Sequence, residues 1–532
     1  MLESSSGILW PRLIAVFAVI WGFSVLRRIF RLVKVALTAS EFPKLYTPFY
    51  PFSFPGALFT SSSWNDGRDW HWVRRFQTYR QSETVLVVPI LAGKPGLWSS
   101  NIDIGRQVAA GGQRSDFIKP PDSNRPLLAW GMNVSAAEGP MWRKHRRIVG
   151  AAFGPELYKL VWNKTREIYR DMIEVEGWKN ANVVDIPTIQ KITAKLAFLL
   201  ISTCGFGFPP TWEDFPQTAD GSMPIQEALR IVAETEILFT FLPKWLRFLP
   251  ISGMREGRLA RKRLRIFMQD QVTERKGIVA AGDKRADVFT IMVKSNEDES
   301  SKYQLDDSEL IGNVFVMLFA GHETTASSLA VALGYMSIHE EIQNEVLEQI
   351  ISVLGPTRDP EYDDYFKLDK VIAIFYEAIR MIPAGHVLIR GAAEDTVLTV
   401  QNPVGEEGTK TVPIAKGTSV IIDMVGVQHN PRYFEDPEEY KPSRWYDLPA
   451  DSEQFTAFGV GSRACLGRRF ATVEATCFLT LLLRDWKVLP VLRPGETKEA
   501  WRGRVLNDVR VGMTMKPGDF PIKLARRNPL SK

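Results

Sequence analysis

Apolar residues recur at helical spacing along most of the chain, and short alternating stretches interrupt them. Helices are predicted by this spacing in four stretches: within 153–294, from 310 onward, across 371–382 and across 467–484. Asp306 and Glu309 predict a capping box at the start of the second of these. Strands are predicted by alternation in three stretches: 83–88, within 396–422, and 510–524 with a turn near Pro517 and Gly518. The pattern is therefore mostly helical, with a few short strands.

The N-terminus opens with an apolar stretch from Leu13 to Leu26, which has the length of a short membrane span when counted from Ile8. Basic residues follow it at once, at Arg27, Arg28, Arg31 and Lys34. By the positive-inside rule, the chain after this helix is cytosolic. The alternative is a cleaved signal peptide with a weak cleavage site at 36–39, but a chain with only three cysteines is not typical of secretion.

Domain organisation follows from this start. Residues 1–34 are predicted as a membrane anchor with its basic flank, and residues 35–60, punctuated by prolines, as a stiff linker. Residues 61–532 are then one large domain. A net charge of +5 without a long basic block excludes the composition of a nucleic-acid-binding protein. The six histidines show no zinc-ligand spacing, so no histidine metal site is expected.

The strongest candidate site is the stretch 458–467, which ends where a helix is predicted to begin. Cys465 precedes that helix, and the positive end of a helix dipole favours thiolate over thiol. Glycines beside it, Gly459 among them, allow a bend that turns backbone N–H groups toward the sulfur. Phe458 can cover the sulfur, and Arg463 offers a planar cation to an anionic group. These features suit a thiolate that ligates haem iron, whereas the alternative is a buried core thiol.

This stretch resembles the signature of the cytochrome P450 superfamily, the haem-thiolate monooxygenases. The signature is Phe, two residues, Gly, one residue, Arg, one residue, Cys, one residue, Gly, and the chain matches it at Phe458, Gly461, Arg463, Cys465 and Gly467. The resemblance implies a haem b cofactor (iron protoporphyrin IX) with Cys465 as the axial iron ligand. It also implies a mainly α fold with a small β-rich lobe, here preceded by one membrane helix. The stretch 133–147 is similar to fungal members.

A second pattern lies in a helix predicted to start at Gly139, with a proline in its first turn. Trp142 and Arg146 are four residues apart and share a helix face. An indole N–H beside a guanidinium suits a carboxylate. The resemblance implies that both bind the haem propionates, and His145 is a further candidate for this contact. The alternative is a solvated basic face.

A third pattern, Ala320-Gly321-His322-Glu323-Thr324-Thr325, lies in the middle of the helix predicted from residue 310. Small side chains there leave room for a flat cofactor and a diatomic ligand. A threonine hydroxyl can bond back to a carbonyl, and a neighbouring carboxylate can feed protons through water. The resemblance implies that Ala320 borders the haem, that Thr324 is the hydroxyl on the oxygen side and that Glu323 is the acid of the proton relay. The alternative is a tightly packed helix with Glu323 on a solvated face.

Two further arginine positions carry the resemblance. Glu377 and Arg380 lie three residues apart on an apolar helix, and the resemblance implies that Arg444 joins them in a structural, not catalytic, brace. Arg390 follows this helix and matches a position that often binds a propionate in the family. The brace would fix the segment that carries the cysteine motif.

The resemblance implies an enzyme that inserts one oxygen atom of O2 into a C–H or C=C bond of a small apolar substrate, in secondary metabolism or xenobiotic oxidation. No dinucleotide-binding motif opens a βαβ unit, so electrons are expected from a separate NADPH-cytochrome P450 reductase, with cytochrome b5 as a further candidate partner. Basic residues at Lys144, Arg147, Arg468 and Arg469 form either its docking patch or a solvated face. The anchor implies the endoplasmic reticulum membrane, with the catalytic domain in the cytosol.

Three alternative functions stay open at this point. Some members of the superfamily rearrange peroxides without external electrons, which the intact pair of Glu323 and Thr324 disfavours. A haem-binding carrier or sensor is the second, and a membrane-tethered helical interaction protein without haem is the third. No residue pattern identifies the substrate, which is expected to be apolar: a terpenoid, a fatty acid, a polycyclic aromatic or another secondary metabolite.

Overall fold

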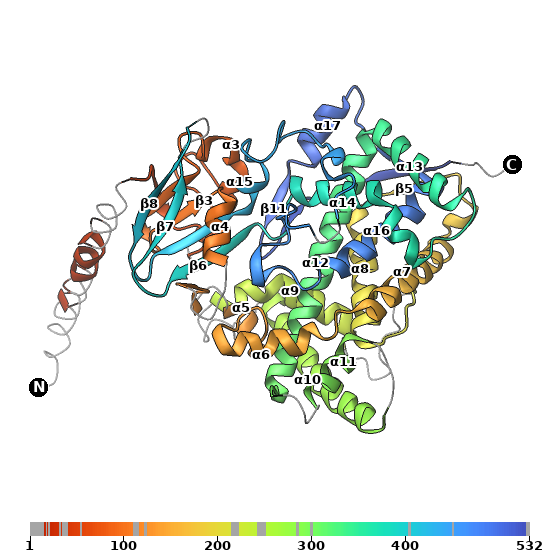
Figure 1. Cartoon of the computed structure of the whole chain (residues 1–532), viewed down its shortest axis with the longest axis horizontal. Helices are drawn as coiled ribbons and strands as arrows, with labels where there is room; N and C mark the ends of the chain where they lie inside the picture. The colour runs from red at the N-terminus through yellow and green to blue at the C-terminus, as the bar shows by residue number, and fades with distance from the viewer. Residues whose placement is uncertain are drawn as a thin grey trace, which may run out of the picture.

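The computed structural model describes residues 15–16, 19, 22–30, 33, 41–53, 56–109, 116–121, 125–213, 223–241, 252–282, 287–297, 302–402, 406–449 and 452–527. A β-rich lobe lies at the end of the molecule where the chain begins, and a larger helical body makes up the rest (Figure 1). The predicted mainly α fold with a small β-rich lobe is confirmed.

The β-rich lobe is built on a six-stranded sheet in the order β1-β2-β3-β9-β6-β4. Its strands are β1 (Lys44–Phe49), β2 (Thr84–Ala92), β3 (Gly96–Ser99), β4 (Phe117–Ile118), β6 (Val387–Ala392) and β9 (Ser419–Asp423). β1 runs parallel to β2, with Lys44 opposite Leu86 and Phe49 opposite Ala92. Part of the stretch 35–60, predicted as a linker, therefore belongs to the sheet. Phe42, just before β1, is buried in the lobe's core.

The remaining strands form three small sheets. They are the hairpin β7 (Thr396–Gln401) with β8 (Thr409–Ile414), the hairpin β11 (Val509–Val511) with β12 (Met515–Pro517), and β10 (Trp486–Pro490) with β13 (Ile522–Arg526) and β5 (Val183–Ile186). The turn predicted near Pro517 and Gly518 was wrong. The β11–β12 turn lies at 512–514, and residues 522–526 pair with β10 instead.

The helical body contains the long helices α6 (Gly139–Gly150), α7 (Pro155–Val175), α8 (Ile189–Phe206), α9 (Ile225–Phe241), α10 (Ser252–Ala280), α11 (Val288–Asn296), α12 (Asp307–Ile338), α13 (Glu340–Leu354), α14 (Asp369–Met381) and α16 (Arg468–Asp485). Shorter helices are α2 (Trp70–Val73), α3 (Arg75–Thr78), α4 (Ile102–Ala109), α5 (Arg125–Leu128), α15 (Met424–Gln428) and α17 (Lys498–Val505). 3-10 turns are η1 (Gly56–Leu58), η3 (Trp178–Asn180), η5 (Tyr362–Lys367), η6 (Pro442–Trp445) and η7 (Gly461–Arg463).

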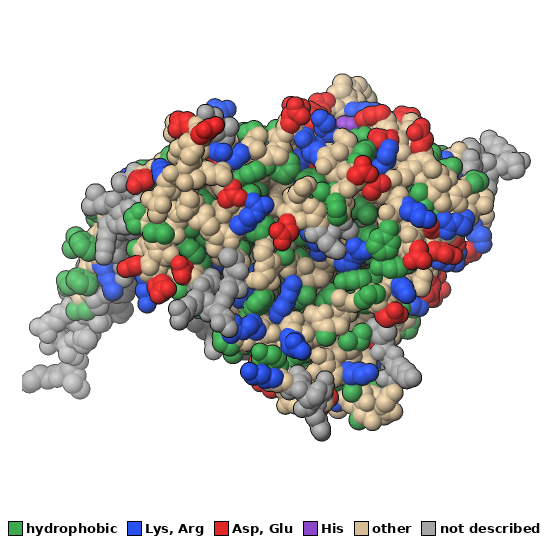
Figure 2. Space-filling model, in the orientation of Figure 1, with side chains coloured by type: hydrophobic (Ala, Val, Ile, Leu, Met, Phe, Trp, Pro, Cys, Tyr) green, Lys and Arg blue, Asp and Glu red, His purple; other side chains and the backbone are tan. Residues whose placement is uncertain are grey.

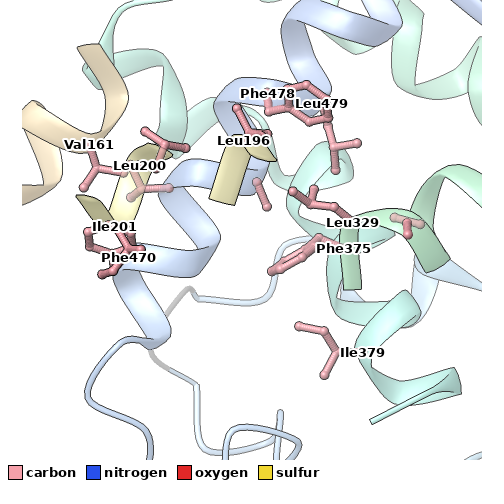
Figure 3. Packing of buried hydrophobic residues seen from close by; sticks show 14 of the residues in the cluster. Val161, Leu196, Leu200, Ile201, Leu329, Phe375, Ile379, Phe470, Phe478 and Leu479 are labelled. Atoms are coloured by element: carbon pink, nitrogen blue, oxygen red, sulfur yellow. The ribbon is translucent and has the colours of Figure 1, made fainter. Parts of the chain in front are cut away.

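Helix α12 runs through the centre of the body, and the capping box predicted at its start is confirmed. The Asp306 side chain accepts a hydrogen bond from Glu309 N at 2.8 Å, and Glu309 Oε2 accepts one from Asp306 N at 3.0 Å. Side chains of α7, α8, α12, α14 and α16 interdigitate around it, Leu329 and Phe375 among them (Figure 3). Two of these core helices, α8 and α12, are long and apolar enough to cross a membrane, but two thirds of the apolar 18-residue stretch in each is buried inside the body.

The predicted anchor falls largely outside the described residues. Residues 22–30 are helical, and Phe23, Leu26, Ile29 and Phe30 are exposed there. This helix projects from the β-rich lobe (Figure 1).

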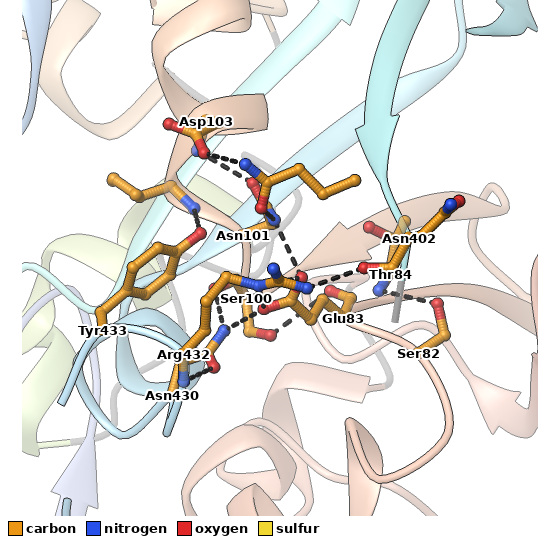
Figure 4. Close-up of polar contacts among 12 residues, drawn as sticks. Ser82, Glu83, Thr84, Ser100, Asn101, Asp103, Asn402, Asn430, Arg432 and Tyr433 are labelled. Carbon is orange, nitrogen blue, oxygen red and sulfur yellow. Dashed lines mark hydrogen bonds and ion pairs between the residues drawn. The ribbon is translucent and has the colours of Figure 1, made fainter. Parts of the chain in front are cut away.

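A buried polar cluster joins the β-rich lobe to the chain that approaches the cysteine motif. Glu83, just before β2, accepts hydrogen bonds from Asn101 Nδ2 at 2.9 Å, Asn430 Nδ2 at 2.6 Å and Arg432 Nε at 2.9 Å (Figure 4). Because the carboxylate is nearly buried, its partners are held by charge-assisted hydrogen bonds. The cluster therefore fixes the segment around Asn430 against the start of β2.

Candidate functional site

Cys465 lies in a tight turn between η7 and α16. Gly459 and Gly461 have φ of 82° and 69°, a left-handed conformation that glycine adopts at little cost. Cys465 N donates to Phe458 O at 2.9 Å, which closes the turn. The thiol is surrounded by protein and yet has exposed surface, so it borders a hollow. The charge of a buried thiolate must be compensated by a cation or a metal, so the sulfur of Cys465 is expected to bind one.

The surroundings of the sulfur act on its ionisation in two directions. Burial raises the pKa of the Cys465 thiol, whereas the N–H groups of Gly467 and Arg468 and the charge of Arg146 lower it. Those N–H groups belong to the start of α16, where the helix dipole is positive. The sequence-based expectation that backbone N–H groups turn toward the sulfur thus agrees with this geometry.

A cluster of cations lies beside the turn, and we call Lys119, Arg390 and Arg463 the cationic cluster. Arg463 Nη2 pairs with Glu138 Oε2 at 2.7 Å, and its guanidinium carbon lies 4.3 Å from the ring centre of Trp142. Arg390, on β6, is buried and among the described residues makes no ion pair. Burial, with the charges of Arg390 and Arg463, lowers the pKa of Lys119 to about 7.

Glu138 is the one carboxylate that raises the pKa of these three cations, so the cluster has an excess of positive charge among the described residues. Buried cations in excess are costly unless an anion pairs with them. A group with carboxylates at its edge supplies such a charge. The cluster and the thiol at Cys465 therefore fit an iron porphyrin with two propionates, in which the sulfur ligates the metal.

Trp142 and Arg146 both lie on α6 and reach this region, but in different ways. The Trp142 ring stacks under Arg463, whereas Arg146 Nη1 donates to Ala464 O at 3.2 Å, beside the cysteine. His145 points elsewhere. Its ring contacts Asn313 Nδ2 at 2.8 Å and Glu309 Oε1 at 3.4 Å on α12, so the structure does not bring it to the cationic cluster.

After its exposed first residues, helix α12 is buried from Glu309 to Ile338 except over Ala320–Thr324, where Ala320 is exposed and the next four residues are half-buried. A core helix with an opening in its middle borders an internal space. A Cβ on Gly321 would lie 3.0 Å from Ile201 of α8, so glycine at this position lets α8 and α12 pack closely. The small side chain of Ala320 leaves the space beside the helix open. Thr324 Oγ1 donates to Ala320 O at 2.8 Å, as expected for a threonine inside a helix.

Glu323 is not on a freely solvated face. Its Oε1 forms an ion pair with Lys516 Nζ at 3.0 Å, and the Glu323 side chain is 20% exposed. Lys516 comes from β12, far along the chain. Sequence reasoning missed Lys516, Lys119 and Glu138, because nothing in their local sequence marks them.

The predicted brace forms in the core. Arg380 Nε and Nη2 donate to the two carboxylate oxygens of Glu377 at 2.8 Å each, and both side chains are fully buried. Arg444 Nε lies 3.4 Å from Glu377 Oε1, and Trp445 Nε1 donates to Oε2 at 2.8 Å. The brace thereby joins α14 to η6, upstream of the cysteine turn.

Comparison with known proteins agrees with these features. A family model for cytochrome P450 matches residues 110–514. Cytochrome P450 monooxygenase 124 of Postia placenta is 35% identical over 421 residues, covering 78% of this chain and 80% of the relative. Cyclooctat-9-en-7-ol 5-monooxygenase of Streptomyces melanosporofaciens is 28% identical over 381 residues, covering 71% and 76%.

The fold has a counterpart among solved structures. A crystal structure of a cytochrome P450 (CYP102L1) superimposes with a TM-score of 0.67 at 20% identity, covering 85% of this chain and 97% of that one. The family model covers more than half of the chain, and one relative is 35% identical, so together they identify the family. The chain therefore belongs to the cytochrome P450 family, as a monooxygenase similar to fungal members.

Proposed function

We propose that the chain is a haem-thiolate monooxygenase that inserts one oxygen atom of O2 into a small apolar substrate, with electrons from a separate NADPH-dependent reductase. The observation that carries this proposal is the thiol of Cys465, exposed to a hollow and faced by the first N–H groups of α16. Haem b, when bound, supplies the activation of O2. The residues around it supply binding, orientation and protons.

The cationic cluster is proposed to bind the propionates. Arg390 and Arg463 present guanidinium groups, and Lys119 adds a third cation, whose pKa is lowered by burial and by the charges of these two arginines. Trp142, stacked under Arg463, orients that guanidinium. Gly459 and Gly467 are proposed to let the backbone approach the cofactor, and Phe458 to shield the thiolate.

Arg146 and His145 are proposed to act at a distance from the propionates. Arg146 lies near the sulfur and favours its ionised form, since a cation stabilises a thiolate. His145, wedged against Asn313 and Glu309, holds α6 to α12. Of the residues that the sequence predicted at the haem propionates, Arg146 and His145 are thereby assigned other roles.

Proton delivery is proposed to run from Glu323 to Thr324. The Thr324 hydroxyl donates its hydrogen bond to Ala320 O, so the lone pairs of its oxygen stay available to accept a hydrogen bond from water. The ion pair with Lys516 orients Glu323 at the edge of the opening in α12. General acid catalysis of this kind can run through one water that bridges the two side chains.

The reductase is proposed to dock on the face of α6 that carries Arg147, which is exposed. Lys144 is less available for this, because it pairs with Glu309 at 2.7 Å, and Arg468 donates to Ser452 O at 2.9 Å. The apolar N-terminal helix supports attachment to the endoplasmic reticulum membrane. Among relatives, the one named for cyclooctat-9-en-7-ol supports an apolar alcohol or hydrocarbon as substrate.

The deciding experiment is the spectrum of the reduced, purified protein with carbon monoxide. We expect the red-shifted Soret band of a thiolate ligand, lost in Cys465→Ala and kept in Cys477→Ala, a buried cysteine in the same C-terminal region. With reductase, NADPH and O2, a panel of apolar substrates should give oxygenated products. A carrier or sensor would give the band without products, an isomerase would give products without NADPH, and a protein without the band refutes the proposal.

A further inference from the structure

The hairpin of β11 and β12 lies where the β-rich lobe meets the helical body (Figure 1). Two contacts of β12 fix it beside the candidate site. Met515 N donates to Ala384 O at 2.9 Å, in the loop that follows α14. Lys516 Nζ pairs with Glu323 Oε1 at 3.0 Å, at the opening in α12. The hairpin therefore forms a wall of the space beside that opening.

The tip of the hairpin is held by a histidine. His386 lies in the same loop as Ala384, and its Nε2 is 3.4 Å from Gly512 O. Gly385 is exposed although both its neighbours are buried, and a Cβ there would meet nothing within 4 Å. Gly512 is exposed too, so open space borders the tip of the hairpin.

His386 is in turn bound by a second buried histidine. His71 Nε2 lies 2.9 Å from His386 Nδ1, and the two rings stack with their centres 4.9 Å apart. His71 is on α2 and has no exposed surface, and His386 is 3% exposed. The space-filling view shows scarcely any histidine on the face that it draws, in keeping with this burial (Figure 2). Trp98 closes the pair off, with its ring centre 5.9 Å from that of His71.

The proton positions in this chain of contacts can be assigned. A carbonyl oxygen only accepts hydrogen bonds, so His386 carries its proton on Nε2, toward Gly512 O. Burial lowers the pKa of His386 to about 4, so near pH 7 the ring is neutral and its Nδ1 is an acceptor. His71 Nε2 must then donate to it. His71 Nδ1 is buried without a partner among the described residues, so the chain of hydrogen bonds starts at this ring.

We propose that His71 is a positioning residue for the substrate: through His386 it fixes the tip of the β11–β12 hairpin and thereby the width of the space over the opening in α12. This inference rests on the proposed monooxygenase function, because it concerns the wall that a substrate meets. Helix α2 holds the base of the hairpin as well, since Trp72 Nε1 donates to Asn507 O at 3.1 Å, two residues before β11. A change in α2 should therefore alter which substrates fit without touching them.

Hydrogen–deuterium exchange of the full-length, haem-loaded protein tests the positioning directly. His71→Leu leaves His386 Nδ1 without a donor, whereas His386→Asn keeps that acceptor but is too short to reach Gly512. Both should speed exchange in peptides that span 509–517 by about 2- to 10-fold, the factor that one hydrogen bond typically supplies. His71→Gln places an amide N–H near the position of Nε2 and should restore the original rate.

Tyr79→Phe is the matched control. Tyr79 Oη donates to Asp423 Oδ2 at 2.8 Å in the same lobe, so this variant gives up a hydrogen bond to a fully buried carboxylate that does not touch the hairpin. It should leave exchange in 509–517 unchanged. Unchanged exchange in His71→Leu overturns the proposal. An equal rise in 522–526 of β13 also overturns it, because the histidine pair would then contribute only to overall stability.

Ligand affinity tests the consequence for the substrate. Imidazole and a long-chain alkylimidazole both bind haem iron, but only the second extends along the wall. In His71→Leu the affinity for the alkylimidazole, measured from the Soret shift, should fall about 2- to 10-fold, and that for imidazole should stay the same. His71→Gln should recover it. Equal effects on both ligands, or none, overturn the proposal. A protein without the carbon monoxide band refutes the proposed monooxygenase, while the exchange result still decides whether His71 positions the hairpin.

Discussion

The buried brace around Glu377 gives the sharpest stability prediction. Glu377→Gln keeps the shape of the side chain but replaces one acceptor oxygen by an NH2 group that faces donors. Arg380, with no exposed surface, then keeps its charge while losing its carboxylate, and Trp445 Nε1 or Lys441 N loses its acceptor. Removing one partner of a fully buried ion pair typically costs about 3–5 kcal/mol. That is a large part of the roughly 5–15 kcal/mol by which native domains are stable.

The assay is urea unfolding of the haem-loaded protein, followed by the Soret band. Glu377→Gln should lower the free energy of unfolding by about 3–5 kcal/mol. Arg444→Gln gives up the 3.4 Å contact with Glu377 and the hydrogen bond from Arg444 Nη2 to Asp436 O at 2.8 Å, but leaves the Glu377–Arg380 pair intact, so it should cost less. Glu156→Gln is the control, because its pair with Lys159 is 3.7 Å long between side chains 79% and 54% exposed, and such pairs contribute about 0–1 kcal/mol. A loss below about 1 kcal/mol for Glu377→Gln would refute the reasoning.

Three further outcomes are expected. Haem affinity, measured by haem titration, should fall by up to about tenfold per pH unit above about pH 7, because Lys119 must carry a proton to pair with carboxylates. Lys119→Met should bind haem more weakly at pH 7, but its affinity should not change with pH in this range. Thr324→Val should keep the carbon monoxide band and lower product formation by about 10²-fold with more peroxide released, whereas Thr324→Ser should retain most turnover. Asp306→Ala should cost about 0.5–2 kcal/mol in urea unfolding through the lost cap on α12.

Much of the fold could be predicted because its long helices carry strong local signals. The start of α12 was marked by its capping box, and α14 and α16 by apolar periodicity that agrees with the structure within about two residues. The short strands were harder, since a strand of three to five residues holds too few alternations to fix its partner. β13 pairs with β10 and β5, and only the fold brings those segments together.

In the candidate site, too, some residues could be predicted from local sequence and others could not. Cys465, Thr324 and Glu377 stand in short motifs whose spacing already fixes their geometry. Lys516 reaches Glu323 from a strand almost two hundred residues later, so no local sequence pattern predicts this ion pair. His145 shows the converse case, because its place in a motif suggested a propionate, and packing of α6 on α12 turns its ring to Asn313.

The excess of positive charge in the cationic cluster indicates a bound anion more directly than the sequence motifs do. Arg390 on β6, Arg463 at the end of η7 and Lys119 before the start of α5 come from three separate segments, and their charges repel one another across a poorly solvated space. Such an arrangement destabilises the fold unless an anion completes it. A chain that keeps three cations around a single carboxylate, Glu138, therefore points to a dianionic group bound there. The position of that group, next to the thiol of Cys465, is what an iron porphyrin with two propionates requires.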